Sequence, residues 1–121
     1  MYSIILTDKF RKDIEFYERK RKYKKVKDDI GQVVKELSLG NLIGDEIPRL
    51  KMFDEDKKII KVRAVNTDTK SGKSNGYRII YYAIKSDEQI FLLTLYSKKD
   101  DNRVLTNQEI MDIVNKELLD N

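Results

Sequence analysis

The chain of 121 residues is long enough for one hydrophobic core, and its 38% charged and 40% hydrophobic residues predict a single folded domain over residues 1–121. It has no cysteine and no histidine, which excludes thiol nucleophiles, Ser-His-Asp triads, zinc sites and the histidine acid/base pair of a metal-free ribonuclease. The formal net charge of +4 favours an acidic partner, because a basic balance concentrates phosphate-bearing molecules near the surface.

The N-terminal segment, MYSIILT, has neither the length nor the pattern of a signal peptide, and no apolar run approaches the length of a membrane span. We therefore expect a cytoplasmic protein with no membrane contact. The acidic residues are scattered or lie in the turn-like segments at residues 54–56 and 100–101, which does not favour a carboxylate site for a hard cation. We expect no metal and no other cofactor.

The first third of the chain predicts a strand followed by a helical hairpin. Residues 2–6 have the β-branched and aromatic composition of a strand, and Thr7 can cap a helix whose first turn holds Asp8. A second helix is predicted over residues 24–39, with Leu39-Gly40 as its C-cap. Each helix has an apolar stripe that predicts a core-facing side, formed by Leu6, Phe10, Ile14 and Tyr17 in the first and by Val26, Ile30, Val33, Val34 and Leu37 in the second.

The densest basic run, RKRKYKK, spans residues 19–25 between the two predicted helices. One interpretation is a nucleic-acid or ribosome contact, with Tyr23 available to stack on a base. The other is a solvated junction between helices that charge keeps soluble. The run is far in sequence from the candidate site described below and has no geometry of its own, so both interpretations stay open.

The second half of the chain predicts an antiparallel sheet of about four strands and a C-terminal helix, which makes the fold class α+β. A loop with the only proline, Pro48, comes first, and strands are expected at residues 50–53, 59–65, 77–83 and 90–96. The last two strands are continuously apolar, as in central strands covered by helices. Thr106 and Glu109 form a capping box directly before the apolar stripe of the final helix, which consists of Ile110, Ile113, Val114 and Leu118.

Three cations lie in these predicted strands. Period two places Lys61 and Arg63 on the same face, opposite the more apolar one. Arg78 shares its parity with apolar residues at the start of the next strand, where an unpaired charge is costly. The sequence leaves open whether Arg78 pairs with a carboxylate or stands at an open rim where a phosphate binds.

Two polar segments next to the strands contain further lysines that we expect to contact RNA or phosphate. The loop NTDTKSGKSN, residues 66–75, has small, flexible residues together with Lys70 and Lys73, and such a loop can bring backbone amides and ammonium groups against a phosphate. Lys99 follows the last predicted strand. Because a strand and not a helix follows GKS, a nucleotide-binding P-loop is excluded.

In combination, four segments resemble the RelE/ParE superfamily of type II toxin-antitoxin toxins. They are KVR (61–63), GKSNGYRIIYY (72–82), IFLLTLYSKKD (90–100) and LTNQEI (105–110). The chain looks most like the HigB-type branch, in which a GKSGG-like loop precedes an arginine and a paired-tyrosine strand. The resemblance covers the chain from about residue 44 to its C-terminus. It implies a RelE-like fold and a ribosome-dependent mRNA endonuclease that a cognate antitoxin neutralises by wrapping its basic surface.

The resemblance also assigns functional residues by position. The sequence departs from the family where Asn75-Gly76 replaces the usual double glycine, and where Leu105 and Asn107 occupy the region in which some relatives have a catalytic tyrosine. The second departure leaves the identity of the general base open. The matching residues are the strand arginine Arg78, the basic strand pair Lys61 and Arg63, the Y-x-K ending Tyr96 and Lys98, and the loop lysine Lys73.

These residue types suit cleavage of a phosphodiester without histidine. The reaction deprotonates a ribose 2′-hydroxyl, stabilises a doubly charged transition state and protonates the leaving 5′-oxygen. Arg78 and Arg63 can hold the phosphate in a planar fork and stabilise the growing charge. Within this cluster of cations, Lys61 or Lys98 can serve as the proton donor or acceptor of the reaction. Tyr96 can stack on a base or accept a proton.

Two other classes of function remain open on the sequence. The same fold in its ParE-like form poisons DNA gyrase without cutting RNA, and the basic cluster around Arg78 is the feature that favours the nuclease. A non-catalytic RNA-binding module is the second alternative. Such a module would bind RNA with a steep salt dependence and leave it intact.

Overall fold

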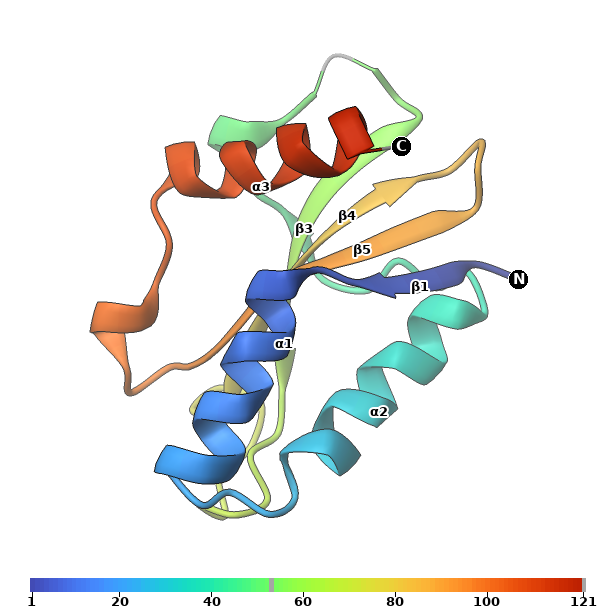
Figure 1. Ribbon diagram of the computed structural model, residues 1–121. Coiled ribbons are helices and arrows are strands. Elements are labelled where there is room, and N and C mark those ends of the chain that lie inside the picture. Colours follow the sequence, from blue (N-terminus) through green and yellow to red (C-terminus); the bar gives the residue numbers. More distant parts are fainter. Residues whose placement is uncertain (53, 121) are drawn as a thin grey trace.

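A mixed sheet of five strands forms the centre of the protein in a computed structural model that describes residues 1–52 and 54–120 (Figure 1). The strand order is β1-β5-β4-β3-β2, with β1 parallel to β5 and the other neighbours antiparallel. The expected α+β class is confirmed, and the N-terminal strand belongs to the same sheet. The strands are β1 (Ser3–Leu6), β2 (Asp45–Glu46), β3 (Lys57–Ala64), β4 (Tyr77–Ile84) and β5 (Gln89–Ser97).

The strand predicted over residues 50–53 is wrong for the part that the structure describes. Pro48–Leu50 forms a short 3-10 helix, η2, and residues 51 and 52 are in no strand, while Phe53 lies outside the described residues. Proline has a fixed φ and no N–H, so it suits the first position of a helix better than a strand. The strand that precedes β3 is instead β2, which lies in the region predicted as a loop.

Two helices follow β1, as predicted. Thr7 caps α1 (Asp8–Glu15), since its Oγ1 accepts a hydrogen bond from the backbone N–H of Phe10 at 3.3 Å. After a junction, α2 extends over Val26–Ser38. The sequence did not predict that α1 continues into the π-helix η1 (Phe16–Lys20), in which the helical turn is wider.

The C-terminal part consists of the 3-10 helix η3 (Asp101–Arg103) and the helix α3 (Asn107–Asp120). The capping box is confirmed in both directions. The N–H of Glu109 donates to Thr106 Oγ1 at 3.1 Å, and the N–H of Thr106 donates to Glu109 Oε1 at 2.9 Å.

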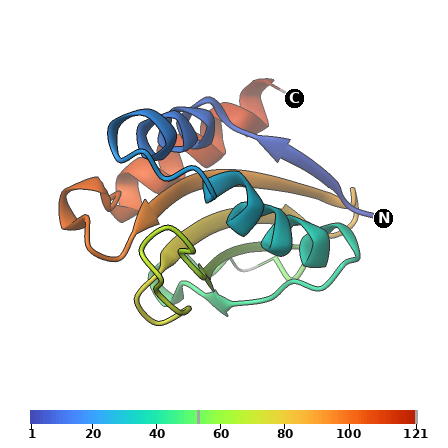
Figure 2. The same cartoon turned by 90° about the horizontal axis from the view of Figure 1, so that it is seen from below.

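Helices cover both faces of the sheet, and Figure 2 shows α2 and α3 on opposite sides of the central strands. Because β4 and β5 lie between these layers, all eight residues of β4 and all but the first residue of β5 are buried. The helices α1 and α2 share one core with Ile60, Val62, Tyr77, Ile79, Tyr81, Leu92 and Leu95, and α3 shares the other with Ile59, Ile80, Tyr82, Phe91, Leu93 and Tyr96.

Glycine is required where the loop at residues 66–75 meets the sheet. A Cβ on Gly76 would overlap the carbonyl oxygen of Ala64 at the end of β3, and it would lie 2.9 Å from the carbonyl oxygen of Gly72. The close approach holds the loop against the ends of β3 and β4, next to the cations identified in the sequence.

Candidate functional site

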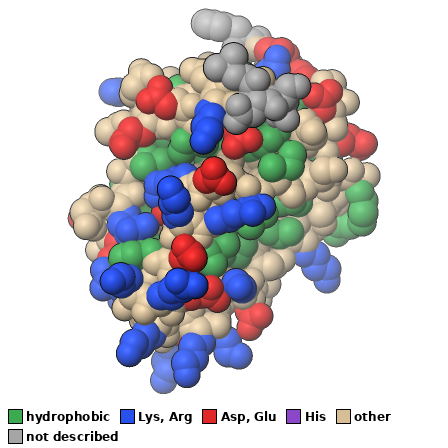
Figure 3. Space-filling model, in the orientation of Figure 1, with side chains coloured by type: hydrophobic (Ala, Val, Ile, Leu, Met, Phe, Trp, Pro, Cys, Tyr) green, Lys and Arg blue, Asp and Glu red, His purple; other side chains and the backbone are tan. Residues whose placement is uncertain are grey.

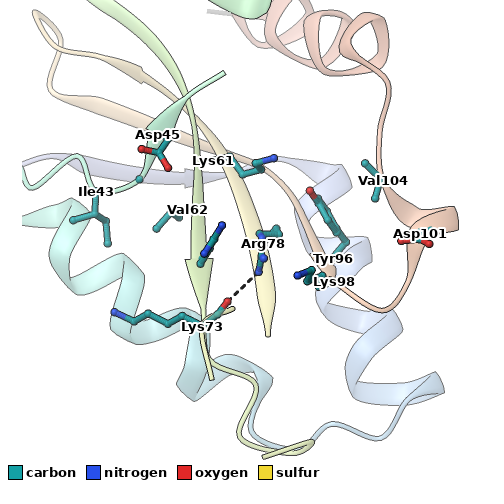
Figure 4. A pocket seen from close by; sticks show the side chains of 12 residues that line it. Ile43, Asp45, Lys61, Val62, Lys73, Arg78, Tyr96, Lys98, Asp101 and Val104 are labelled. Carbon is teal, nitrogen blue, oxygen red and sulfur yellow. Dashed lines mark hydrogen bonds between the residues drawn. The ribbon is translucent and has the colours of Figure 1, made fainter. Parts of the chain in front are cut away.

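An open cleft of about 730 Å³ lies where β3 ends, β4 begins and β5 ends (Figure 4). One wall is formed by β2 with the residues just before it, and the opposite wall by η3 with the residue that follows it. The lining residues are Ile43, Gly44, Asp45, Lys61, Val62, Arg63, Lys73, Arg78, Tyr96, Lys98, Asp101 and Val104. All five candidate catalytic residues and the loop residue Lys73 are therefore brought together by the fold.

Three of these residues form a row across adjacent strands. Arg63 on β3 is the register partner of Arg78 on β4, and Arg78 is the register partner of Tyr96 on β5. Partners in an antiparallel sheet have Cβ atoms about 5 Å apart, so one phosphate group can contact more than one of the three side chains. Lys61 precedes Arg63 on the same face, as predicted, and Lys98 lies just beyond the end of β5.

Arg78 is buried, with 7% of its surface exposed, although it is charged. Its guanidinium donates hydrogen bonds to three backbone carbonyl oxygens, at 3.0 Å to Lys73, 2.9 Å to Ser74 and 3.2 Å to Tyr77. Among the side chains that the structure describes, Arg78 has no carboxylate partner, which disfavours the ion pair of the two alternatives that the sequence left open. Carbonyl dipoles orient the cation without neutralising it.

The surroundings of Arg78 are electrostatically unfavourable for a cation. Burial lowers the pKa of Arg78, and the nearby positive charge of Arg63 lowers it further, while Tyr96 acts in the opposite direction. The guanidinium nevertheless stays charged at neutral pH, because an arginine begins from a very high pKa. An anion bound beside Arg78 and Arg63 would relieve the repulsion between them.

The other cations of the cleft are available to a ligand. Lys61, Arg63 and Lys98 are exposed, and their side chains make no hydrogen bond or ion pair with any residue that the structure describes. Two carboxylates, Asp45 and Asp101, stand on the opposite walls. Five cationic side chains thus face two anionic ones, which gives the cleft a positive potential.

Tyr96 is a hydrogen-bond donor in this setting. Only 6% of its surface is exposed, and burial raises its pKa, with Arg78 offsetting part of the effect. The phenol is therefore protonated at neutral pH, which does not favour the expectation that it accepts a proton. Its buried ring also offers little free face for stacking on a base.

The three lysines predicted to contact RNA or phosphate, Lys70, Lys73 and Lys99, do not all lie at the cleft. Lys73 holds Arg78 through its backbone carbonyl, and Figure 4 shows its side chain extending away from Arg78. Lys70 and Lys99 are exposed but do not line the cleft. The structure thus brings one of these three lysines to the cleft and places the other two outside it.

The basic run at residues 19–25 has partners that the sequence could not reveal. Tyr23 stacks on Tyr17, with ring centroids 5.8 Å apart and an interplanar angle of 10°, so this face of its ring is not free for a base. Lys25 N–H donates to Asp68 at 2.8 Å, which joins the run to the loop at residues 66–75. Lys and Arg side chains gather at this lower end of the molecule in Figure 3.

Sequence reasoning missed both walls of the cleft. Asp45 belongs to a two-residue strand in a region whose Gly44 and Pro48 predict a loop. Asp101 and Val104 belong to a short 3-10 turn and its exit, which have no periodicity to detect. The single usable signal was the pair Asp100-Asp101, which follows the Y-x-K ending after one further lysine.

No helix in the described part of the chain is both long and apolar enough to cross a bilayer. Within the same residues, no three or more His, Cys, Asp or Glu side chains form a group that could hold a metal ion. The chain matches no protein-family model and no curated protein.

Proposed function

We propose that this protein is the toxin of a type II toxin-antitoxin system, a HigB-like member of the RelE/ParE superfamily that cleaves mRNA on the ribosome. The observation that supports this most strongly is the row of Arg63, Arg78 and Tyr96 across three strands, flanked by the exposed side chains of Lys61 and Lys98. The sequence segments that resemble the family, and an α+β sheet with a C-terminal helix, are further support.

The proposed reaction uses the RNA itself as the nucleophile. The 2′-oxygen of a ribose attacks the adjacent phosphorus, and the bond between phosphorus and the 5′-oxygen of the next nucleotide breaks. The products are a 2′,3′-cyclic phosphate and a 5′-hydroxyl. One proton leaves the 2′-hydroxyl and one is added to the 5′-oxygen, so no further reactant is consumed.

The arginines and Tyr96 have the chemistry to stabilise this transition state. Arg78 is fixed in direction by three carbonyl oxygens, so it is preorganised for the charge that develops on the phosphate oxygens. Arg63 can approach from the solvent side of the same row. Tyr96 can donate its phenolic hydrogen to a phosphate oxygen.

Proton transfer is then assigned to the two flanking lysines. In an in-line displacement the attacking and leaving oxygens lie on opposite sides of phosphorus, so a base and an acid are needed from two directions. Figure 4 shows Lys61 and Lys98 on different sides of Arg78. One of them would accept the proton of the 2′-hydroxyl and the other would protonate the 5′-oxygen.

The same cations suit the proposed partners. A ribosome and its message present phosphate backbones, and exposed lysines and arginines bind them in a salt-dependent way. A cognate antitoxin would neutralise the protein by placing acidic side chains against the cleft. DNA gyrase inhibition and RNA binding without cleavage are the alternatives that the experiment below distinguishes.

The test is primer extension on an mRNA translated in a purified system, with the parent protein, with Arg78→Ala and without protein. We expect new cuts in the translated message only, and a loss of cleavage on the order of a hundredfold in Arg78→Ala, as for other transition-state donors. Arg11→Ala is a matched control, because Arg11 is an exposed arginine on α1 outside the cleft.

The folded state of each variant is verified by circular dichroism, since Arg78 is buried. Absence of cuts with folded parent protein would contradict the nuclease. Inhibition of DNA supercoiling by gyrase in that case would indicate the ParE-like alternative, and salt-sensitive RNA binding without cuts would indicate a binding module. Cuts that Arg78→Ala leaves unchanged would contradict the role of Arg78.

A further inference from the structure

The last part of β5 provides one side of the cleft and is paired on one side only, because β4 pairs with it as far as Ser97 while β1 pairs with it only as far as Leu92. Tyr96 is near the end of β5, and Lys98 and Asp101 lie beyond it. Within the sheet, the contact that holds this turn is the N–H of Lys98 donating to the carbonyl oxygen of Gly76 at 2.9 Å. The edge of this segment that faces away from β4 therefore depends on contacts from outside the sheet.

Tyr17 on the π-helix η1 makes such a contact at the residue between them. Its side chain is fully buried, and its hydroxyl accepts a hydrogen bond from the N–H of Ser97 at 2.7 Å. The same hydroxyl donates to Asp100 Oδ2 at 2.9 Å, and Asp100 Oδ1 accepts a hydrogen bond from Arg21 at 2.6 Å. Because the hydroxyl donates to Asp100, its lone pairs are left to receive the Ser97 amide.

A second anchor fixes the two flanks of the same segment. The buried carboxylate of Asp13 on α1 accepts hydrogen bonds from the N–H of Leu95 at 2.9 Å and from Arg103 Nη2 at 2.9 Å. The Leu95 amide has no strand partner on this edge, because β1 pairs with β5 only as far as Leu92. Asp13 thus holds the segment before and after Tyr96 and Lys98.

The π-helix brings consecutive aromatic residues to this segment. The ring of Phe16 lies 3.7 Å beneath the guanidinium carbon of Arg103, while the next residue, Tyr17, contacts Ser97 and Asp100. A π-turn is rare and is frequently found at functional sites. Here its effect is to point two adjacent side chains at one short segment of the chain.

We propose that Tyr17 is a positioning residue, whose hydroxyl fixes the backbone at Ser97 so that Tyr96 and Lys98 both face Arg78. This inference rests on the proposed nuclease function, because its consequence is a faster chemical step. Tyr17 does not line the cleft, so it acts through Ser97 and not on the RNA.

The test is Tyr17→Phe, which removes the hydroxyl and keeps the ring contacts with Phe16, Tyr23 and Tyr77. At saturating concentrations of programmed ribosomes we expect the maximal cleavage rate to fall roughly tenfold to a hundredfold, since small displacements of catalytic groups have effects of this order. The half-saturating concentration stays unchanged, because the RNA-binding cations remain in place.

Tyr77→Phe is the matched control. The ring of Tyr77 lies 5.5 Å from that of Tyr17 in the same core, but its buried hydroxyl has no hydrogen-bond partner among the described residues. We expect this variant to cleave at the parent rate. A parent-like rate in Tyr17→Phe, an equal loss in both variants, or a loss confined to the half-saturating concentration would overturn the positioning role.

Amide hydrogen exchange gives a readout that does not require cleavage. We expect faster exchange of the amides at residues 97–103 in Tyr17→Phe, and parent-like exchange in Tyr77→Phe. Unchanged protection in Tyr17→Phe would overturn the inference. If the parent protein does not cut RNA, the proposed function fails on its own, and hydrogen exchange still decides whether Tyr17 holds this segment.

Discussion

At the scale of single residues, the cations of the cleft divide into one that is held and several that are free. Arg78 is buried and clasped by three carbonyl oxygens, whereas Lys61, Arg63 and Lys98 are exposed and make no hydrogen bond or ion pair in the described part of the chain. A held cation provides fixed geometry for a transition state, and free cations can adapt to a moving RNA backbone. In the proposed reaction, Arg78 is therefore the preorganised group, while the exposed cations adjust to the bound RNA.

Buried tyrosines give a prediction about pH that is independent of function. Tyr17, Tyr77 and Tyr81 are fully buried, and desolvation raises the pKa of each well above its ordinary value near 10. Above about pH 10 the unfolded chain loses these phenolic protons while the folded chain keeps them. The folded state then binds more protons, so the free energy of unfolding falls as the pH rises.

We expect the three tyrosines to leave the free energy of unfolding unchanged below about pH 9. Above pH 10 this free energy should fall by up to roughly 1.4 kcal/mol per pH unit for each tyrosine. Urea denaturation between about pH 8 and pH 11 measures it. Tyrosinate absorbance offers a second readout, free of tryptophan, since the chain has none. A stability that rises above pH 10, or ionisation of all tyrosines near pH 10 without unfolding, would contradict the burial of these phenols.

At the scale of elements, the loop at residues 66–75 links the fold to the cleft. Its carbonyl oxygens hold Arg78, and its own position depends on a bridge between Asn66 and Ser71 and on hydrogen bonds from Thr67 to Asp29 of α2 at 2.6 and 2.9 Å. Gly76 allows the loop to approach β3. The loop therefore transmits the packing of α2 and β3 to the arginine.

Gly76→Ala should disturb this arrangement. The added Cβ would overlap the carbonyl oxygen of Ala64, and we expect a loss of about 1–3 kcal/mol in the free energy of unfolding, as for other overpacking changes. Displacement of the loop should also reduce cleavage at least about tenfold, because Arg78 loses its fixed orientation. Urea denaturation and primer extension measure the two effects.

Gly72→Ala is the control for that substitution, since a Cβ at Gly72 meets no atom within 4 Å. We expect it to change stability by less than about 0.5 kcal/mol and to leave cleavage unchanged. Equal effects of the two substitutions would show that flexibility of the loop, and not the contact with β3, is what matters.

Short-range signals in the sequence were sufficient for much of the fold. The caps at Thr7 and Thr106 were predicted because their hydrogen bonds join groups only three residues apart. The hydroxyl of each threonine accepts a hydrogen bond from a backbone N–H of the first turn, and Glu109 accepts one from the N–H of Thr106. The shared face of Lys61 and Arg63 follows from period two alone. These features need no knowledge of which strands pair.

The remaining features depend on long-range pairing, which residue patterns do not contain. Arg63, Arg78 and Tyr96 form a row because turn lengths and the register shift near Ile80 align three strands. The role of Tyr17 was missed because a buried tyrosine in a helical stripe has the same pattern as an ordinary core residue. The π-helix and the strand β2 also have no local sequence pattern that distinguishes them from an ordinary helix and a loop.

At the scale of the whole molecule, positive charge is distributed over two connected regions. The cleft has five cationic side chains, and the basic run at residues 19–25 is joined to the loop beside the cleft through Lys25 and Asp68. Arg19, Arg21 and Lys25 of that run are in ion pairs with Glu15, Asp100 and Asp28. The run is therefore partly neutralised, whereas none of the five cationic residues that line the cleft is in an ion pair with another described residue.

The most direct test of the proposed nuclease function is the cleavage of translated mRNA by Arg63→Ala. Arg63 is exposed and has no hydrogen bond or ion pair with the described residues, so its removal should change the free energy of unfolding by less than about 0.5 kcal/mol. We expect cleavage to fall on the order of a hundredfold, while Arg11→Ala cleaves as the parent does. Parent-like cleavage by a folded Arg63→Ala protein would contradict a catalytic site built on the row of Arg63, Arg78 and Tyr96.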